Sequence, residues 1–151
     1  MPPSVRPAVA SDVAVIVEFN RRLALETENK ILDPAILSAG VAAVLGDPGR
    51  GRYFVAEANG EVIGQTAITY EWSDWRNGWV WWLQSVYVRA DARGKGVFRA
   101  IFEHIDAESK RAGYVVGIRL YVEHENRSAQ ETYRRLGFEE MHFYLYHLGV
   151  S

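Results

Sequence analysis

Hydrophobic residues recur along this chain with two different periods, which separate predicted helices from predicted strands. Apolar residues three or four positions apart indicate the buried face of a helix, and short β-branched or aromatic runs indicate strands. Helices are expected after the cap signal Ser11-Asp12 as far as Asn29, and after Asp33-Pro34 as far as Gly46. The other predicted elements, in chain order, are strands Arg52–Ala58 and Val62–Tyr70 around an Asn59-Gly60 turn, a loop Glu71–Gly78, a strand Trp79–Val88, a helix Gly96–Ala112, a strand Tyr114–Val122, a helix Asn126–Leu136 and one or two strands over Phe138–Leu148.

This order of elements predicts an α/β fold with a mixed sheet. Strand–helix–strand units combined with a hairpin favour helices on both faces of the sheet. No internal repeat, low-complexity tract or linker divides the chain, so residues 1–151 are expected to form a single domain.

Composition excludes several classes of protein. The chain has 48% hydrophobic and 24% charged residues, which is typical of a globular domain. Zero cysteines exclude a disulfide framework, a thiolate metal site and a cysteine nucleophile. The net charge of −2 argues against a nucleic-acid partner, and no metal site is expected from the four histidines. Without a signal peptide or a long apolar stretch, we expect a soluble, cytoplasmic protein that does not enter a membrane.

The most informative segment joins the strand ending at Val88 to the next predicted helix. It contains Arg93-Gly94-Lys95-Gly96, two glycines interleaved with two cations. Unpaired N–H groups at a helix N-terminus attract anions, and glycine lets the backbone approach them closely. The segment lacks the Ser or Thr of a P-loop after the lysine and the third glycine of a dinucleotide fingerprint. It predicts a phosphate or pyrophosphate site of another kind.

A second segment, taken together with the glycine-containing loop, carries a resemblance to a known family. Asn126, Ala129, Tyr133 and Leu136-Gly137-Phe138 lie downstream in the pattern N-x-x-A-x-x-x-Y-x-x-x-G-F. Together with the R-x-x-G-x-G/A-like loop starting at Arg93, this pattern resembles the GNAT superfamily of N-acetyltransferases. The resemblance covers the whole chain, because the order of elements also matches.

The resemblance implies a sheet splayed between its two central strands, with acetyl-CoA as cosubstrate and no metal. The pantetheine arm is expected beside the strand and the pyrophosphate on the loop. The implied cofactor-binding residues are Val86, Tyr87, Val88, Arg93, Gly94, Lys95, Gly96, Val97, Phe98, Arg99 and Asn126. Phe98 replaces the small residue usual at its position. Its side chain points either into the core or across the site, which would then be narrower.

The resemblance also assigns a catalytic residue. Tyr133 is expected to be the general acid that protonates the leaving thiolate. The general base stays open among Glu71, Asp74, Glu123, His124 and a chain of water molecules, because the central strand Trp79–Gln84 carries no acid.

All five tryptophans lie between Trp72 and Trp82, and they are candidates for lining the acceptor site. We expect some to form core and others to line a cleft for a primary amine, with a small cationic amine favoured by cation–π contact. The candidate acceptor residues are Glu26, Trp72, Asp74, Trp82 and Gln84. A protein amine is also compatible.

Aromatic residues crowd the predicted strand Phe138–Leu148. An unpaired edge of this kind aggregates unless a partner covers it, so a homodimer is expected. Two other functions are compatible with the sequence: an inactive GNAT-fold protein that binds acyl-CoA or only dimerises, and an acyltransferase that uses a longer acyl chain or a hydroxyl acceptor.

Overall fold

The computed structural model describes residues 2–151, which divide into two compact units. One ends at Tyr121 and the other is Val122–Ser151, and each is described by itself. The helices and strands of the first unit are β1 (Ser4–Pro7), α1 (Val13–Glu28), α2 (Pro34–Gly46), β2 (Arg52–Ala58), β3 (Glu61–Ser73), β4 (Gly78–Val88), α3 (Val97–Ala112) and β5 (Val115–Leu120), with short 3-10 turns η1 (Ala10–Asp12) and η2 (Ala90–Ala92).

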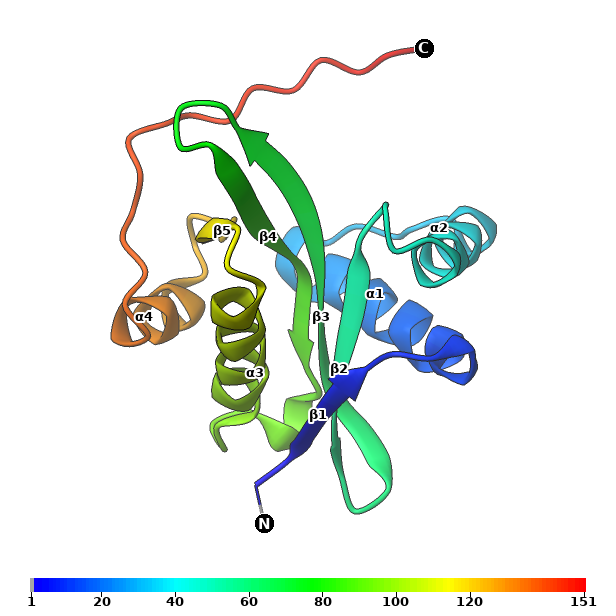
Figure 1. The fold of residues 1–151 in the computed structure, drawn as a ribbon. Helices are drawn as coiled ribbons and strands as arrows, with labels where there is room; N and C mark the ends of the chain where they lie inside the picture. The colour runs from blue at the N-terminus through cyan, green and yellow to red at the C-terminus, as the bar shows by residue number, and fades with distance from the viewer. Residues whose placement is uncertain (1) are drawn as a thin grey trace. The chain divides into compact units, whose positions relative to one another are not determined.

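The sheet of the first unit is mixed, as the sequence predicts. Its strands lie in the order β1-β2-β3-β4-β5 (Figure 1). The first three pairings are antiparallel, and β5 runs parallel to β4. The β4–β5 pairing ends at Leu83 and Leu120, so β4 after Leu83 has only β3 as a paired strand in the described chain. The sheet therefore opens between its parallel strands beyond Leu83.

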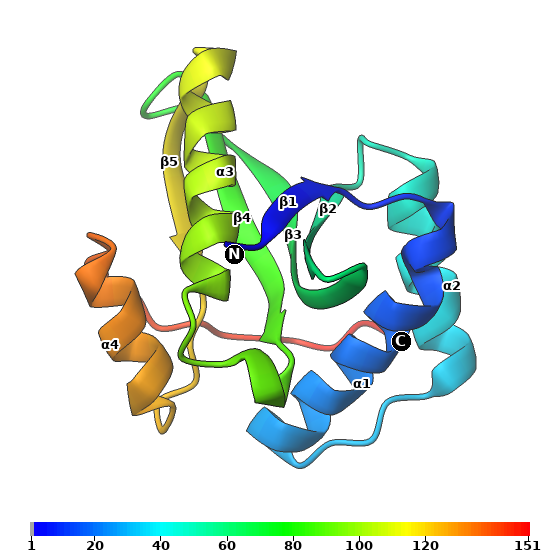
Figure 2. The same ribbon diagram turned by 90° about the horizontal axis from the view of Figure 1, so that it is seen from below.

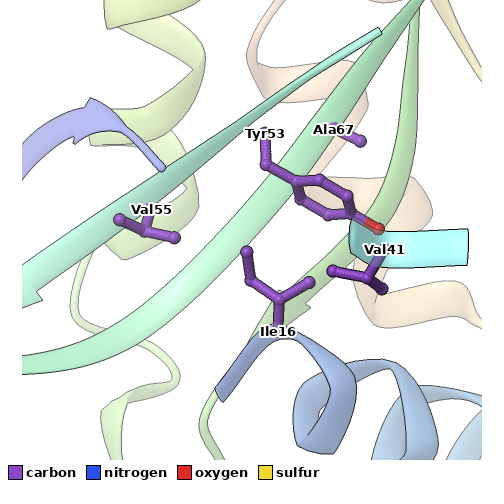
Figure 3. Close-up of a cluster of buried hydrophobic side chains, with 5 residues drawn as sticks. All are labelled: Ile16, Val41, Tyr53, Val55 and Ala67. Carbon is purple, nitrogen blue, oxygen red and sulfur yellow. The ribbon is translucent and has the colours of Figure 1, made fainter. Parts of the chain in front are cut away.

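Helices cover both faces of this sheet. α1 and α2 lie on one face and α3 on the other (Figure 2). Under α1 and α2, five buried side chains from two helices and two strands form a core (Figure 3), namely Ile16, Val41, Tyr53, Val55 and Ala67. On the opposite face, Ile101 and Ile105 of α3 are fully buried. Burying each such side chain contributes about 1.5–3 kcal/mol.

Residue patterns located the helices well. Asp33 caps α2 by accepting hydrogen bonds from the N–H groups of Ala35 and Ile36 at 2.9 and 3.1 Å. Gly113 ends α3 in the left-handed conformation, with φ of 79°. Of the helices in the described chain, none is long and apolar enough to cross a membrane.

The strands differ from the sequence prediction in three respects. No strand was predicted where β1 lies, a four-residue strand that contains Pro7 and, in the described chain, pairs with β2 alone. The predicted loop 71–78 shortens to residues 74–77, because β3 continues to Ser73 through a pairing of Trp72 with Trp79. Residues 138–148 form no strand, because they pair with no other segment of the described chain.

The second unit contains α4 (Arg127–Arg135). Asn126 Oδ1 accepts a hydrogen bond from the N–H of Ala129 at 3.2 Å, which caps the helix as predicted. Gly137 follows the helix with φ of 101°, a conformation that favours glycine.

Candidate active site

A glycine-containing loop leads from η2 to α3. Gly94 and Gly96 adopt left-handed backbone conformations with φ of 76° and 79°. A Cβ atom built on either glycine would meet no heavy atom of the protein within 4 Å. The loop therefore faces open space at both glycines, in front of the first turn of α3. Backbone N–H groups and the helix dipole at such a position attract anions, so this surface fits a phosphate group.

Arg93, which the sequence assigns to the cofactor, is tied to the strand before the loop and to α1. Its Nε donates to the carbonyl oxygen of Val88 at 2.9 Å, and its Nη2 donates to both carboxylate oxygens of Glu26 at 3.1 and 3.2 Å. Its guanidinium carbon lies 5.2 Å from the centre of the Tyr87 ring. Burial and the Glu26 carboxylate raise the pKa of Tyr87. The arginine thus anchors the loop to α1 rather than extending freely over it.

The other two cations of the loop region lie at its surface. Lys95 borders a hollow of about 250 Å³ whose charged lining also includes Glu61, Arg89 and Asp91. Arg99 Nη1 lies 3.5 Å from Glu103 Oε1, one turn further along α3.

Phe98 points into the protein interior. It is only 8% exposed, and Val97 before it is also buried. Of the two arrangements compatible with the sequence, the one with the side chain in the core is therefore correct. The aromatic ring does not lie across the open side of the glycine loop.

A bulge interrupts β4 just before the segment assigned to pantetheine. Gln65 of β3 pairs with Tyr87, but Ala67 pairs with Gln84, so β4 contains one extra residue. Ser85 within the bulge has φ of 52°, in the left-handed region. This bulge lies where β4 and β5 part, as the resemblance implies.

Two buried side chains of β3 hold the bulge. Gln65 Nε2 donates to the carbonyl oxygen of Ser85 at 3.1 Å, and Thr66 Oγ1 donates to that of Gln84 at 3.0 Å. Both side chains are fully buried. Sequence reasoning missed them, although two adjacent polar residues within the apolar run of β3 were a usable signal.

Four of the five tryptophans lie on β3 and β4 and divide between the two faces of the sheet. Side chains alternate along a strand, so Trp72 and Trp79 share the face of buried Trp81, whereas Trp82 lies on the other face. Trp75, in the turn after β3, is 91% exposed. The expectation that some tryptophans form core is confirmed for Trp81, which is 3% exposed.

The ring of Trp82 already has three polar or aromatic neighbours. Its Nε1 donates to Glu71 Oε1 at 2.9 Å, and it stacks on Tyr121 with ring centres 4.5 Å apart. The Arg119 guanidinium carbon lies 5.9 Å from the ring centre, and Arg119 Nη1 lies 3.6 Å from Glu71 Oε2. Arg119 therefore offsets the negative charge of Glu71 beside this indole.

The structure separates the candidate acceptor residues into four places. Trp82 and Gln84 share one face of β4, where Gln84 Nε2 donates to Thr69 Oγ1 at 3.3 Å. Trp72 points to the opposite face, and Asp74 begins the turn after β3. Glu26 pairs with Arg93 at the glycine loop.

In the second unit, the motif residues around Tyr133 define the end of α4. The N–H of Phe138 donates to the carbonyl oxygen of Tyr133 at 3.0 Å, and the two rings meet edge to face with centres 5.9 Å apart. Burial raises the pKa of Tyr133 to about 12. The phenol is therefore protonated at neutral pH.

The candidate general bases differ in their hydrogen-bond and ion-pair partners. Glu123 Oε2 accepts a hydrogen bond from the N–H of Glu125 at 2.7 Å within the turn before α4. Glu71 bonds to Trp82 and Arg119. Among the described residues, no three histidine, aspartate or glutamate side chains converge as a metal site.

Comparison with known proteins places this arrangement in a family. The model of the acetyltransferase (GNAT) family matches residues 18–138. An uncharacterized N-acetyltransferase of Methanocaldococcus jannaschii is 35% identical over 89 residues, a match that covers 58% of this chain but only 39% of that protein.

Solved structures agree in fold. A possible acetyltransferase from Clostridium difficile 630 is 42% identical with a TM-score of 0.90, covering 100% of this chain and 99% of that chain. A predicted acetyltransferase from Clostridium acetobutylicum, solved with acetyl-CoA, is 20% identical with a TM-score of 0.79, covering 97% of this chain and 96% of that one. With a family match across most of its length, the chain belongs to the GNAT family of acetyltransferases.

Proposed function

We propose that this chain, acting as one domain over residues 1–151, transfers an acetyl group from acetyl-CoA to a primary amine. The observation that carries the proposal is the pair of left-handed glycines, Gly94 and Gly96, whose missing side chains leave open space before α3. A pyrophosphate would bind the backbone N–H groups there. The Clostridium acetobutylicum protein of the same fold was solved with acetyl-CoA.

The open edge of β4 supports a place for the rest of the cosubstrate. Beyond the bulge, Tyr87 and Val88 pair with β3 on one side and lack β5 on the other in the described chain. An amide-containing arm can hydrogen-bond to such an edge as an added strand does. Gln65 and Thr66 fix the bulge and so determine where this edge lies.

Tyr133 is proposed as the general acid. Acetyl-CoA supplies an activated acyl group, and its thiol must leave as a thiolate that gains a proton. With a pKa raised by burial to about 12, the phenol holds its proton at neutral pH and can donate it. Asn126 is proposed to cap α4 and to contact the cosubstrate.

Two carboxylates considered for the amine site already have cationic partners. Glu26 is paired with Arg93, and Glu71 is paired with Arg119, so neither carboxylate is an unshared partner for a cation. A preference for small cationic amines then depends on Asp74 and the exposed ring of Trp75. Turnover on polyamines, aminoglycosides, amino acids and peptide N-termini decides this, and reaction with neutral or anionic amines alone would contradict a cationic acceptor.

Calorimetric titration with acetyl-CoA tests the proposal. We expect micromolar binding by the natural chain and its loss in Gly96→Glu, because a carboxylate in the open space would repel the pyrophosphate. Absence of binding up to millimolar acetyl-CoA would refute the cosubstrate. Binding by both proteins would refute the placement on this loop.

A further inference from the structure

An arginine of β5, Arg119, lies where the sheet begins to open. It pairs in register with Trp82, one residue before the β4–β5 pairing ends. Both side chains lie on the sheet face covered by α1 and α2 (Figure 2), because Trp82 is two residues from Gln84, which pairs with the core residue Ala67. All of these residues belong to the first unit. Arg119 therefore shares a face with Trp82 and Gln84, two candidate acceptor residues, just before the opening proposed for the cosubstrate.

The guanidinium group of Arg119 has an acidic neighbour but no tight ion pair. Its Nη1 lies 3.6 Å from Glu71 Oε2, which is beyond hydrogen-bond distance. The other carboxylate oxygen of Glu71 accepts a hydrogen bond from Trp82 Nε1 at 2.9 Å. On the opposite face of the sheet, the comparable pair of Arg52 and Glu108 is hydrogen-bonded at 3.0 Å. Glu71 thus offsets the charge of Arg119 without occupying its N–H donors.

Another arginine of the chain shows that one guanidinium group can hold two carboxylates. Arg6 donates hydrogen bonds to Asp12 at 2.8 Å and to Glu57 at 2.7 Å. The planar group carries five N–H donors, and two parallel ones match the two oxygens of a carboxylate. Arg119, with a side chain that is 23% exposed, pairs with one carboxylate in the described chain. A carboxylate supplied by a ligand would complete the arrangement seen at Arg6.

We propose that the acceptor is a small amine that also carries a carboxylate, such as an amino acid, and that Arg119 binds this carboxylate. The inference rests on the proposed acetyl transfer and names the class of its acceptor. The carboxylate of the ligand takes the guanidinium fork, and its ammonium group offsets the charge of Glu71. Two residues of a strand span about 7 Å, so Gln84 and the opening of the sheet lie within reach of a molecule anchored beside Trp82.

The reaction leaves the carboxylate of such an acceptor unchanged. The amine, once it has lost a proton, forms a C–N bond to the acetyl carbonyl carbon while the C–S bond of acetyl-CoA breaks. The released thiolate takes up a proton. The product keeps its carboxylate but no longer carries an ammonium charge beside Glu71, so its binding is weaker and its release is favoured.

Matched pairs of acceptors test this inference with the natural chain. The common amino acids, β-alanine and γ-aminobutyrate are each compared with their primary amides, which keep the amine but lack the negative charge. Rates are compared at equal concentrations of unprotonated amine. For the best-accepted pair we expect kcat/KM to be about 10- to 150-fold higher for the free acid, because the amide loses charge-assisted hydrogen bonds.

The outcomes separate this inference from the proposed function. Amides or polyamines that react as well as the free acids would overturn the carboxylate site and leave acetyl transfer to an amine intact. Absence of acetylation of every amine, polyamines included, would refute the transfer itself and this inference with it.

Arg119→Gln and Arg52→Gln form a matched pair of variants. Each arginine lies beside a tryptophan, with its guanidinium carbon 5.9 Å from the Trp82 ring centre or 5.7 Å from that of Trp81. Arg119→Gln should abolish the preference for the free acid without changing the Kd for acetyl-CoA, and Arg119→Lys should restore part of the preference. Arg52→Gln should keep it. This preference compares two substrates on one protein, so a loss of folded protein does not alter it. A preference that survives in Arg119→Gln, or that is lost equally in Arg52→Gln, would overturn the role of Arg119.

Discussion

Gly96 and Gly113, at the two ends of α3, offer a test that separates folding from binding. Both have φ of 79°, and a Cβ on either would meet nothing within 4 Å. Alanine at either position therefore acts through backbone strain and not through a clash. Only Gly96 lies in the loop proposed to hold the pyrophosphate.

The size of both effects follows from this geometry. A left-handed conformation costs a residue with a Cβ about 1–2 kcal/mol. For a chain of this length each kcal/mol lowers Tm by about 2–4 °C, so both variants should melt about 2–8 °C lower. A methyl group at Gly96 also blocks close approach of the anion. Losing one charge-assisted hydrogen bond costs about 1.5–3 kcal/mol, so the Kd for acetyl-CoA should rise roughly 10- to 150-fold.

Thermal melts and calorimetric titrations on the two variants supply the comparison. We expect equal losses of Tm, with weakened acetyl-CoA binding in Gly96→Ala alone. Equal affinity in both variants would refute the reasoning, because the loop glycine would then have no role beyond the backbone conformation that Gly113 shares.

Three further predictions concern single side chains. Tyr133→Phe should lower kcat by at least about tenfold with little change in KM for acetyl-CoA, since a general acid acts only in the transition state. Burial raises the pKa of Tyr133 to about 12, so the natural enzyme should lose no activity through ionisation of this phenol below about pH 11. A loss of activity near pH 9 that is present in the natural enzyme and absent from Tyr133→Phe would contradict this prediction. Thr66→Val should raise KM for acetyl-CoA about tenfold, since the carbonyl of Gln84 loses its hydroxyl partner. Thr66→Ser keeps a hydroxyl and should restore the KM of the natural enzyme. An equal KM in the two variants would show that Thr66 has only a structural role. Asp12→Asn should lower the free energy of unfolding by about 1–3 kcal/mol at pH 7, since Asp12 accepts hydrogen bonds from Arg6.

The contribution of Asp12 to the free energy of unfolding decreases at acid pH. The Arg6 guanidinium lowers the pKa of this carboxyl, so its contribution to stability is present above about pH 4 and is lost as the pH falls further. Urea titrations of the natural chain and Asp12→Asn should therefore converge below pH 4. A constant difference down to pH 2 would contradict this origin of the stability.

Local signals made the helices and the glycine loop predictable. Asp33-Pro34, Asn126 and the glycines act on residues within four positions, so the sequence alone determines their effect. Even there, tertiary contacts intervened at Asp12. It stands at the start of α1 as predicted, but its carboxylate bonds to Arg6 and to the N–H of Val9 instead of capping that helix.

Features that depend on distant partners could not be predicted. Glu26, a candidate acceptor residue, pairs with Arg93, 67 residues away. The Thr66 contact with the bulge exists only once β3 and β4 are in register. β1 and the extension of β3 likewise exist through pairing, whereas the segment after Gly137 has strand periodicity but no partner within the described chain.

Amine-dependent release of CoA thiol from acetyl-CoA tests the central claim most directly, and the cysteine-free chain adds no thiol background. With a panel of primary amines, the natural chain should release thiol at a rate that rises with amine concentration, and mass spectrometry should find the amine acetylated. Acetyl-CoA binding without amine-dependent release across the panel would contradict the account and favour a GNAT-fold protein that only binds acyl-CoA.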